Sequence, residues 1–214
     1  MSTQSLQNIE SELKKRLQYK YIWGQKQNDI WDFHTNFIYS TLRWEELVFK
    51  MKQTAADNNL KKIDLFNYAA NRWFNFWSSV AVEEIFCSIP DVKAVANKKD
   101  KQKDFFLCGI PFDHKTSVFP RQFKKSYEYA QSNKAELITW LYQNQSIQKR
   151  HHLKNRLFIV VFAENGEHWK LKAEISLLKN SIEKYVEGFK PEQLHSFTFV
   201  DDQRTLSDII WVSK

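Results

Sequence analysis

The sequence predicts an α/β protein of the α+β kind, in which a mixed central sheet is flanked by helices and an N-terminal helical extension precedes it. Hydrophobic spacing is helical up to about residue 88, and after "SIPD" at residues 88–91 it becomes that of short strands. Only four Gly and four Pro occur in 214 residues, so few positions interrupt long helices. This length suffices for one domain with its own core.

Three ranges of helical spacing come first, and they are separated by "WGQKQND" and "ADNNLKK". We therefore expect helices over residues 6–23, 29–54 and 63–88. We assign residues 1–60 to the helical extension and 61–214 to the main domain, with a single compact domain as the alternative. The aromatic side chains of the second helix are expected in the core: Trp31, Phe33, Phe37, Trp44 and Phe49.

Strands and helices alternate in the remainder of the chain. "VKAVANK", "DFFLCGI" and "PFDHKTSV" each predict a strand, and Pro120 then opens a helix that continues to about residue 145. "LFIVVFAE" predicts a strand buried on both faces. A helix over 171–187 and the strands "SFTFVD" and "DIIWVS" follow. The order β-β-β-α-β-α-β-β indicates a mixed sheet covered by helices.

The cysteines and the amino terminus bear on location. Cys87 and Cys108 are too few for a disulfide framework and show no C-x-x-C spacing, which favours a reducing cytoplasm. "MSTQSLQNIESELKKRLQ" is neither a signal peptide nor a membrane span of about 20 apolar residues. We therefore expect a cytoplasmic protein without a membrane partner. Serine hydrolases, P-loop ATPases and Rossmann enzymes are excluded, because their glycine motifs are missing from the sequence.

Positive charge is concentrated in the middle of the chain. Between Lys93 and Arg156 there are 14 Lys and Arg against 5 Asp and Glu, whereas the whole chain has a formal net charge of +7. Such a segment suits a polyanion such as nucleic acid, and a solvated basic surface is the alternative. The candidate nucleic-acid-binding residues are Lys98, Lys99, Lys101, Arg121, Lys124, Lys125, Lys149 and Arg150.

The stretch "KDFFLCGIPFDHKTSVFP" predicts a β-hairpin that carries three charged groups. A two-residue turn at Gly109-Ile110 would give Gly the positive φ of a type II′ turn. In that register Asp104 is opposite Lys115. Because side chains alternate with period two, Asp104, Asp113 and Lys115 project from one face.

These three groups suit phosphodiester hydrolysis. Two neighbouring carboxylates raise each other's pKa unless a cation lies between them. Magnesium takes oxygen ligands and is usually held by one or two carboxylates together with phosphate oxygens. A lysine beside the ion can assist the attacking water. The alternative is a cross-strand salt bridge between Asp104 and Lys115, with Asp113 solvated.

A glutamate on the preceding helix belongs to the same candidate site. The apolar stripe of that helix runs through Trp73 and Trp77 to Val80, and its continuation reaches Glu84, with Glu83 at its edge. A glutamate on an apolar face is costly unless it is paired or coordinated. The alternative is that Glu84 lies beyond the packed part of the helix.

The order of elements in the chain resembles that of the PD-(D/E)XK nuclease superfamily, whose fold is restriction endonuclease-like. This order is a helix that carries Glu, a strand, a strand that carries Asp, a strand that carries Asp-x-Lys, a helix and a further strand. The matching residues are Glu83 or Glu84, Asp104, and Asp113-His114-Lys115. The resemblance implies that the acids hold magnesium and that the lysine assists the attacking water. Pro90-Asp91 also offers a literal Pro-Asp, but Asp91 precedes the first strand, whereas this acid belongs on the second.

The sequence and the resemblance together lead to a magnesium-dependent (or manganese-dependent) DNA endonuclease, of a restriction or repair system. RNA stays open as a substrate, and a homodimer stays open as the assembly. The alternative is a catalytically inactive nucleic-acid-binding or interaction module of the same fold. A third hypothesis is a helical scaffold whose aromatic-rich first 88 residues bind a protein partner.

Overall fold

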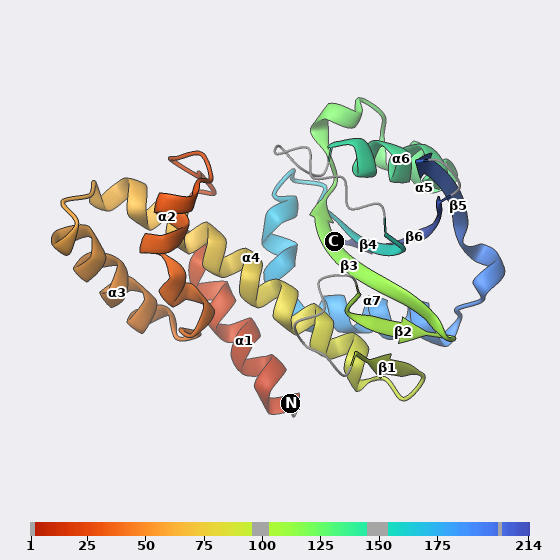
Figure 1. Cartoon of the computed structure of the whole chain (residues 1–214), viewed down its shortest axis with the longest axis horizontal. Helices are drawn as coiled ribbons and strands as arrows, with labels where there is room; N and C mark the ends of the chain where they lie inside the picture. Colours follow the sequence, from red (N-terminus) through yellow and green to blue (C-terminus); the bar gives the residue numbers. More distant parts are fainter. Residues whose placement is uncertain (1–2, 96–102, 145–153, 201–202) are drawn as a thin grey trace. The chain divides into compact units, whose positions relative to one another are not determined.

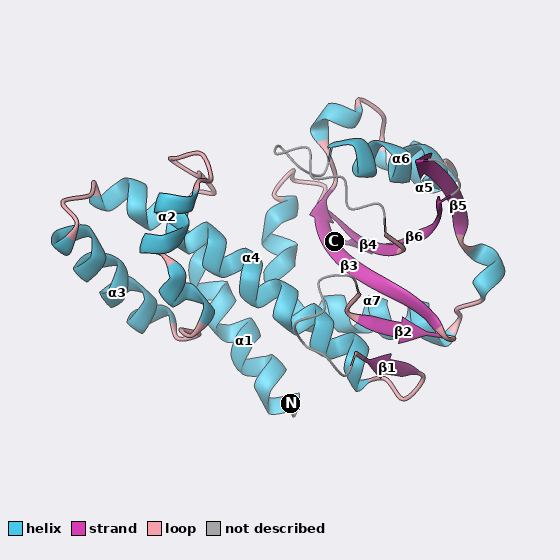
Figure 2. Cartoon of the chain, viewed as in Figure 1, coloured by secondary structure: helices cyan, strands magenta, loops and turns pink. Residues whose placement is uncertain are grey.

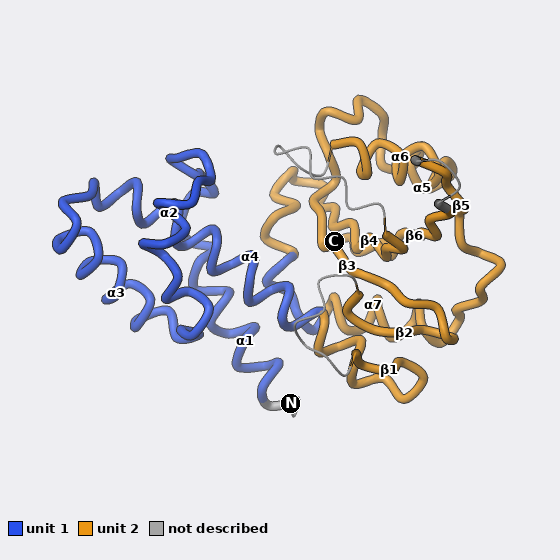
Figure 3. Tube along the Cα trace, in the orientation of Figure 1, with its two compact units in different colours: residues 1–82, 172–176 blue, residues 83–171, 177–214 orange. Residues whose placement is uncertain are grey.

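The computed structural model describes residues 3–95, 103–144, 154–200 and 203–214 (Figure 1). The chain divides into two compact units (Figure 3). The first unit comprises Met1–Val82 and Lys172–Ser176, and the second comprises Glu83–Leu171 and Leu177–Lys214. The division falls within a long helix, whose last residues therefore belong to the second unit.

The first unit is helical. Its core contains large, fully buried side chains, among them Ile9, Leu13 and Trp73. The long helix α4 Lys62–Ser88 follows a series of shorter helical segments, which are α1 Thr3–Lys15, η1 Arg16–Gln18, α2 Asp29–His34, η2 Asn36–Tyr39 and α3 Trp44–Asp57.

The single helix expected over residues 29–54 is wrong, because the chain leaves the helical path before α3. The carbonyl of Thr41 accepts a hydrogen bond from Trp73 Nε1 at 2.7 Å instead of a bond within a helix. The backbone N–H of Trp44, the first residue of α3, donates to Glu12 Oε2 at 2.7 Å. Polar partners on other helices thus satisfy backbone groups at a break that no Gly or Pro marks.

This break also changes which aromatic residues are buried. Trp44 is 5% exposed, as expected, but Phe33 and Phe49 are 74% and 59% exposed. The expectation that Phe33 and Phe49 lie in the core is wrong, since the segments before and after the break do not share one helical face.

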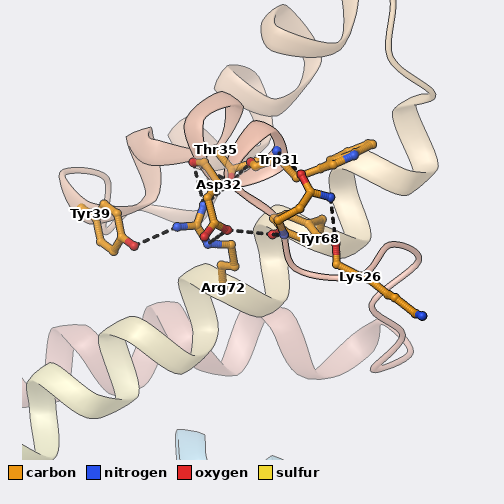
Figure 4. A network of polar contacts seen from close by, with 8 residues as sticks. Lys26, Trp31, Asp32, Thr35, Tyr39, Tyr68 and Arg72 are labelled. Carbon is orange, nitrogen blue, oxygen red and sulfur yellow. Dashed lines mark hydrogen bonds and ion pairs between the residues drawn. The ribbon is translucent and has the colours of Figure 1, made fainter. Parts of the chain in front are cut away.

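A polar network joins α2 and η2 to α4 within the first unit (Figure 4). Asp32 Oδ1 accepts from the hydroxyl of Tyr68 at 2.7 Å and lies 3.2 Å from Arg72 Nε. Arg72 also donates to the hydroxyl groups of Thr35 and Tyr39. Because the Arg72 side chain is only 6% exposed, these partners replace the water that its charge would otherwise need.

The second unit is built around a six-stranded sheet in the order β1-β2-β3-β4-β6-β5 (Figure 2). The first three strands pair antiparallel, β4 is parallel to both β3 and β6, and β5 is antiparallel to β6. The predicted mixed α/β sheet flanked by helices is confirmed. The strands are β1 Val92–Ala94, β2 Phe105–Leu107, β3 Ile110–Val118, β4 Arg156–Phe162, β5 His195–Val200 and β6 Gln203–Ser213.

Helices cover both faces of this sheet (Figure 1). On one face α5 Tyr127–Ser132 and α6 Lys134–Asn144 form a core cluster with Phe158, Val160 and Ile209. On the opposite face lies α7 Ile175–Glu187, whose Ile182 is fully buried. The short segments η3 Arg121–Phe123, η4 His168–Ala173 and η5 Pro191–Gln193 are the remaining helical elements of the described ranges.

The continuous helix expected from Pro120 to residue 145 is wrong. The short segment η3 follows Pro120, and Lys124 then takes a left-handed conformation with φ 57°. The Ser126 side chain accepts from the backbone N–H of Tyr129 and so begins α5 as an N-cap. Within the described ranges, no helix combines the length and apolar character needed to span a bilayer.

Candidate active site

The β2-β3 hairpin turns one residue earlier than the sequence indicated. Leu107 pairs with Ile110 and Phe105 with Phe112, so the two turn residues are Cys108 and Gly109. Their φ values are 49° and 78°, as a type I′ turn requires at both central positions. The turn expected at Gly109-Ile110 is therefore wrong: Gly109 takes the second central position of a type I′ turn, and not the first central position of a type II′ turn.

The corrected register makes the two aspartates neighbours. The strand pairing ends with Phe105 and Phe112, and Asp104 immediately precedes this last pair, so it is not opposite Lys115. The backbone N–H of Asp104 donates to the carbonyl of Phe112 at 2.8 Å, one residue out of step with the pairing of Phe105 and Phe112, so the regular ladder does not continue to Asp104. The Asp113 carboxyl group lies within hydrogen-bonding reach of the Asp104 carboxylate. Asp113 and Lys115 are two residues apart on β3, so they project from the same face of the strand in either register.

His114 anchors Asp104 through a single carboxylate oxygen. Asp104 Oδ2 accepts from the backbone N–H of His114 at 2.9 Å and lies 2.7 Å from Nδ1 of its ring. The His114 side chain is 4% exposed and contacts the rings of Phe86 and Phe105. The His114 side chain projects from the face of β3 opposite to that of Asp113.

The contact between His114 and Asp104 shifts the pKa of both groups. Burial alone would raise the pKa of Asp104, but the hydrogen bond and charge of His114 lower it below its ordinary value. Burial likewise would lower the pKa of His114, yet its hydrogen bond to Asp104 raises it. The charges of Asp104, Asp113 and Glu83 act in the same direction on His114. Both shifts widen the pH range over which Asp104 and His114 are charged together.

Arg156 anchors Asp113 in a similar way. The two residues are Cα partners in the parallel pairing of β3 and β4. Arg156 Nε donates to Asp113 Oδ2 at 2.5 Å, and Arg156 Nη2 contacts the same oxygen. The side chains are 7% and 20% exposed, so the pair is largely withdrawn from solvent. Asp113 Oδ1 takes no part in these two interactions.

Lys115 lies two residues beyond Asp113, on the same face of β3. Burial lowers the pKa of Lys115 to about 8, and the nearby charge of Arg156 adds to this effect while Asp113 opposes it. A lysine in these surroundings can release its proton much closer to neutral pH than an exposed lysine can.

Tyr142 of α6 borders the same face. Its hydroxyl donates to the carbonyl of Lys154 at 2.7 Å. Burial raises the pKa of Tyr142 to about 12, while Ser207 and Arg156 act against the shift and Asp113 adds to it. Tyr142 is therefore close enough to Asp113 and Arg156 for their charges to act on it, and it stays protonated at neutral pH.

The two glutamates predicted for the site lie at the end of α4 that belongs to the second unit. Glu83 is exposed, and its charge acts on His114. Glu84 is partly buried. Among the described residues, no group of three or more His, Cys, Asp or Glu side chains is arranged to hold a metal ion. Neither glutamate is thus gathered with Asp104 and Asp113 into a common set of ligands, and a role for either in metal binding stays a prediction.

The two aspartates fit a magnesium ion as a minimal pair of ligands. Magnesium is commonly held by one or two carboxylates, with water and substrate oxygens completing its shell. Asp104 and Asp113 lie within reach of each other, and their side chains are 24% and 20% exposed. The cation partner of each aspartate occupies Oδ2. Asp104 Oδ1 and Asp113 Oδ1 are the oxygens that could face an ion.

Asp91 is not part of this cluster. It precedes β1, and Val92 pairs with Leu107, which places Asp91 near the hairpin turn. There it lines a pocket together with Phe106, Cys108 and Gly109. Its position agrees with the preference for Asp104 as the acid on the second strand.

Three of the predicted nucleic-acid-binding residues lie beyond the other end of β3. Arg121, Lys124 and Lys125 are exposed, and Lys125 Nζ lies 5.0 Å from the ring centroid of Tyr129. Five residues of strand separate Asp113 from Val118, which corresponds to about 17 Å. This distance equals roughly five base-pair steps of B-form DNA. Lys98, Lys99, Lys101, Lys149 and Arg150 lie outside the described residues.

His114 and Arg156 were not predicted as members of the site. His114 stood inside the Asp-x-Lys triplet but was counted only as a spacer. Arg156 is the first residue of β4, and only the register between parallel strands places it beside Asp113. Such a register has no local signal comparable to a hairpin turn. No family model, curated protein or solved structure matches the chain.

Proposed function

We propose that the protein is a magnesium-dependent endonuclease-like phosphodiester hydrolase that acts on DNA, in a restriction or repair system. The observation that carries this proposal is the proximity of the Asp104 and Asp113 carboxyl groups, with Lys115 on the face of Asp113. Two adjacent carboxylates and a lysine of lowered pKa are the groups that metal-assisted phosphodiester hydrolysis needs.

The order of elements supports the same proposal. A helix, an antiparallel three-stranded meander, helices and a parallel fourth strand follow one another as α4, β1, β2, β3, α5, α6 and β4. The resemblance to the PD-(D/E)XK superfamily implies this order, with the acids on the second and third strands. Asp104 immediately precedes β2, and Asp113 lies on β3.

Each residue has a specific role in this proposal. Asp104 and Asp113 hold the ion, and His114 orients the carboxylate of Asp104. A bound magnesium ion supplies a Lewis acid for the phosphate and a water of lowered pKa. Lys115, when neutral, accepts a proton from the attacking water, and when charged it stabilises the negative charge that develops on the phosphate.

Cleavage of supercoiled plasmid DNA tests the proposal. We expect nicked or linear product with Mg²⁺ or Mn²⁺, no product with EDTA, and no product from Asp113→Ala. Asp91→Ala is the matched control, because it removes an aspartate from the same sheet but outside the cluster, and it should cleave as the unaltered protein does. Equal cleavage by Asp113→Ala would refute the assignment of the site.

A non-catalytic nucleic-acid-binding module is the second candidate, and one observation favours it. Both aspartates already have an internal partner, since the ring of His114 contacts Asp104 and the guanidinium group of Arg156 pairs with Asp113. A structural role for the cluster therefore needs no metal ion. For such a module DNA binding persists without hydrolysis, and Asp113→Ala leaves the DNA affinity unchanged or raises it by removing negative charge.

A further inference from the structure

His114 and Arg156 hold the two aspartates with different degrees of fixation. His114 reaches Asp104 with its backbone N–H as well as with its ring, and the ring is enclosed by Phe86 and Phe105. Its interaction with Asp104 is therefore built into β3. Arg156 reaches Asp113 through its guanidinium group, at the end of a long side chain, and this group also lies 5.8 Å from the ring centroid of Phe158.

Hydrogen bonds of the neighbouring Asn155 hold the backbone of β4 beside Arg156. The Arg156 side chain could therefore move while the strand stays in place. The neighbouring Asn155 accepts from the backbone N–H of Asp113 at 3.0 Å with its carbonyl. Its side chain accepts from the backbone N–H of Leu206 at 2.8 Å and donates to the carbonyl of Pro111 at 3.2 Å. Asn155 thus ties β4 to β3 and β6 directly beside Arg156.

The charges around Asp113 make a divalent ion and the Arg156 guanidinium competitors. Both Arg156 and Lys115 lie near Asp113, close enough for Arg156 to contribute to the lowered pKa of Lys115. A divalent ion bound to Asp113 would be repelled by the guanidinium charge at short range. A phosphodiester brings negative charge, and guanidinium groups bind phosphate oxygens through two parallel N–H donors.

We propose that Arg156 is an exchangeable counter-ion, which neutralises Asp113 in the resting protein and transfers to the phosphate of the substrate when a divalent ion binds Asp113. This inference rests on the proposed function and adds a substrate-binding residue to it. Arg156 is then inhibitory for the binding of metal alone and favourable for the reaction.

The change in metal affinity on removal of Arg156 distinguishes the exchange from a purely orienting role, because the two roles predict changes of opposite sign. If Arg156 only holds the Asp113 carboxylate in place, its removal weakens the binding of metal and slows cleavage. If Arg156 competes with the ion, its removal strengthens the binding of metal in the absence of DNA. Cleavage still slows in that case, because the phosphate of the substrate no longer has its guanidinium partner.

The test is calorimetric titration of the full-length protein with Mn²⁺, in the absence of DNA, combined with plasmid cleavage at saturating Mn²⁺. For Arg156→Gln we expect Mn²⁺ affinity to rise by at least about fivefold and the cleavage rate to fall by at least about tenfold. Arg156→Lys keeps the charge, so its Mn²⁺ affinity should stay close to that of the unaltered protein. Arg204→Gln removes an exposed arginine that donates to Ser196 and lies outside the site, and it should leave the Mn²⁺ isotherm unchanged.

Each outcome separates the inference from the proposed function. Unchanged or weaker Mn²⁺ binding by Arg156→Gln, in a protein that binds Mn²⁺ and cleaves DNA, overturns the exchange and leaves the proposed function standing. Absence of Mn²⁺ binding in both the unaltered protein and Arg156→Gln overturns both. A thermal unfolding transition measured for each variant identifies loss of the fold. If Arg156→Gln does not fold, Arg156→Lys is compared with the unaltered protein instead. A Mn²⁺ affinity of Arg156→Lys several-fold below that of the unaltered protein would overturn the exchange.

Discussion

Asp113 and Arg156 are direct partners in the parallel pairing of β3 and β4, and their side chains meet at 2.5 Å between Asp113 Oδ2 and Arg156 Nε. The interaction joins the hairpin that carries the acids to the central strand of the sheet. It also shows that the charge of the candidate site is set by residues far apart in sequence. His114 has the corresponding role for Asp104, within the hairpin itself.

Lys115 provides the first prediction. Lys115→Ala should lower the rate of DNA cleavage at saturating Mn²⁺ by about 10²–10⁴-fold, which is the usual contribution of a positioned acid or base. Mn²⁺ affinity should change little, because lysine is not a metal ligand in the proposed mechanism. Single-turnover cleavage and a Mn²⁺ titration measure the two effects. A cleavage rate unaffected by the substitution would remove Lys115 from the mechanism.

The basic residues after β3 provide the second prediction. Substitution of Arg121, Lys124 and Lys125 together by Ala should weaken DNA binding and reduce the slope of log affinity against log salt. The expected reduction is about 0.9 for each phosphate that these side chains neutralise. Fluorescence anisotropy of a labelled duplex over a range of NaCl concentrations measures this slope. Lys179→Ala, on α7, is the control, and an unchanged slope in the triple variant would contradict the assignment.

The hairpin turn provides the third prediction. Cys108 adopts a φ of 49°, which Asn tolerates better than Cys does, and its side chain is exposed. Cys108→Asn should therefore raise the free energy of unfolding by about 0.5–1 kcal/mol. Cys108→Ser removes the thiol but keeps the strain, so it should leave stability unchanged. Urea denaturation measures the free energy of unfolding of both variants. A lower free energy of unfolding for Cys108→Asn would argue against the type I′ turn.

Glu10 provides the fourth prediction, which concerns pH. Glu10 Oε2 accepts from the hydroxyl and the backbone N–H of Ser176 at 2.5 and 3.1 Å, and Oε1 accepts from Lys14 at 2.7 Å. Burial alone would raise the pKa of Glu10, but Lys14 and Ser176 lower it below 4.5. Its contribution to stability is therefore present above pH 4.5 and declines as the pH falls through the lowered pKa.

Glu10→Gln should destabilise the protein at pH 7 by about 1–3 kcal/mol, because the substitution removes charged hydrogen bonds. The difference from the unaltered protein should shrink as the pH falls from neutral into the acidic range below the ordinary glutamate pKa. Glu183→Gln is the control, since the Glu183 side chain is 45% exposed and lies 3.7 Å from Lys179, and it should change stability by less than about 0.5 kcal/mol. A difference that grows on acidification would contradict the lowered pKa of Glu10.

The sequence predicted the elements of the sheet well because their signals are local. β4 is buried from Arg156 through Val161, as the run "LFIVVFAE" indicated. The breaks in the predicted helices were missed because their causes lie elsewhere in the chain. The break before α3 depends on Trp73 and Glu12, which satisfy backbone groups from other helices.

For the candidate site, the sequence placed Asp104, Asp113 and Lys115 correctly on one hairpin but indicated the wrong turn. The turn at Cys108-Gly109 requires a non-glycine residue at positive φ, which the residue types alone do not favour. Arg156 was missed because the pairing of β3 with β4 is determined by packing of the whole sheet. The predicted register was wrong by two residues. Because this is an even number, the prediction of which β2 and β3 side chains share a face was not changed by the error.

The joint binding of one divalent ion by Asp104 and Asp113 is the claim on which the proposed function depends. Calorimetric titration of Mn²⁺ into the unaltered protein, Asp104→Asn and Asp113→Asn tests it, with Asp91→Asn as the matched control. We expect saturable binding by the unaltered protein and by Asp91→Asn, and an affinity at least about tenfold lower in both other variants. An isotherm for Asp113→Asn that coincides with that of the unaltered protein, or no binding by the unaltered protein at millimolar Mn²⁺, would contradict the claim.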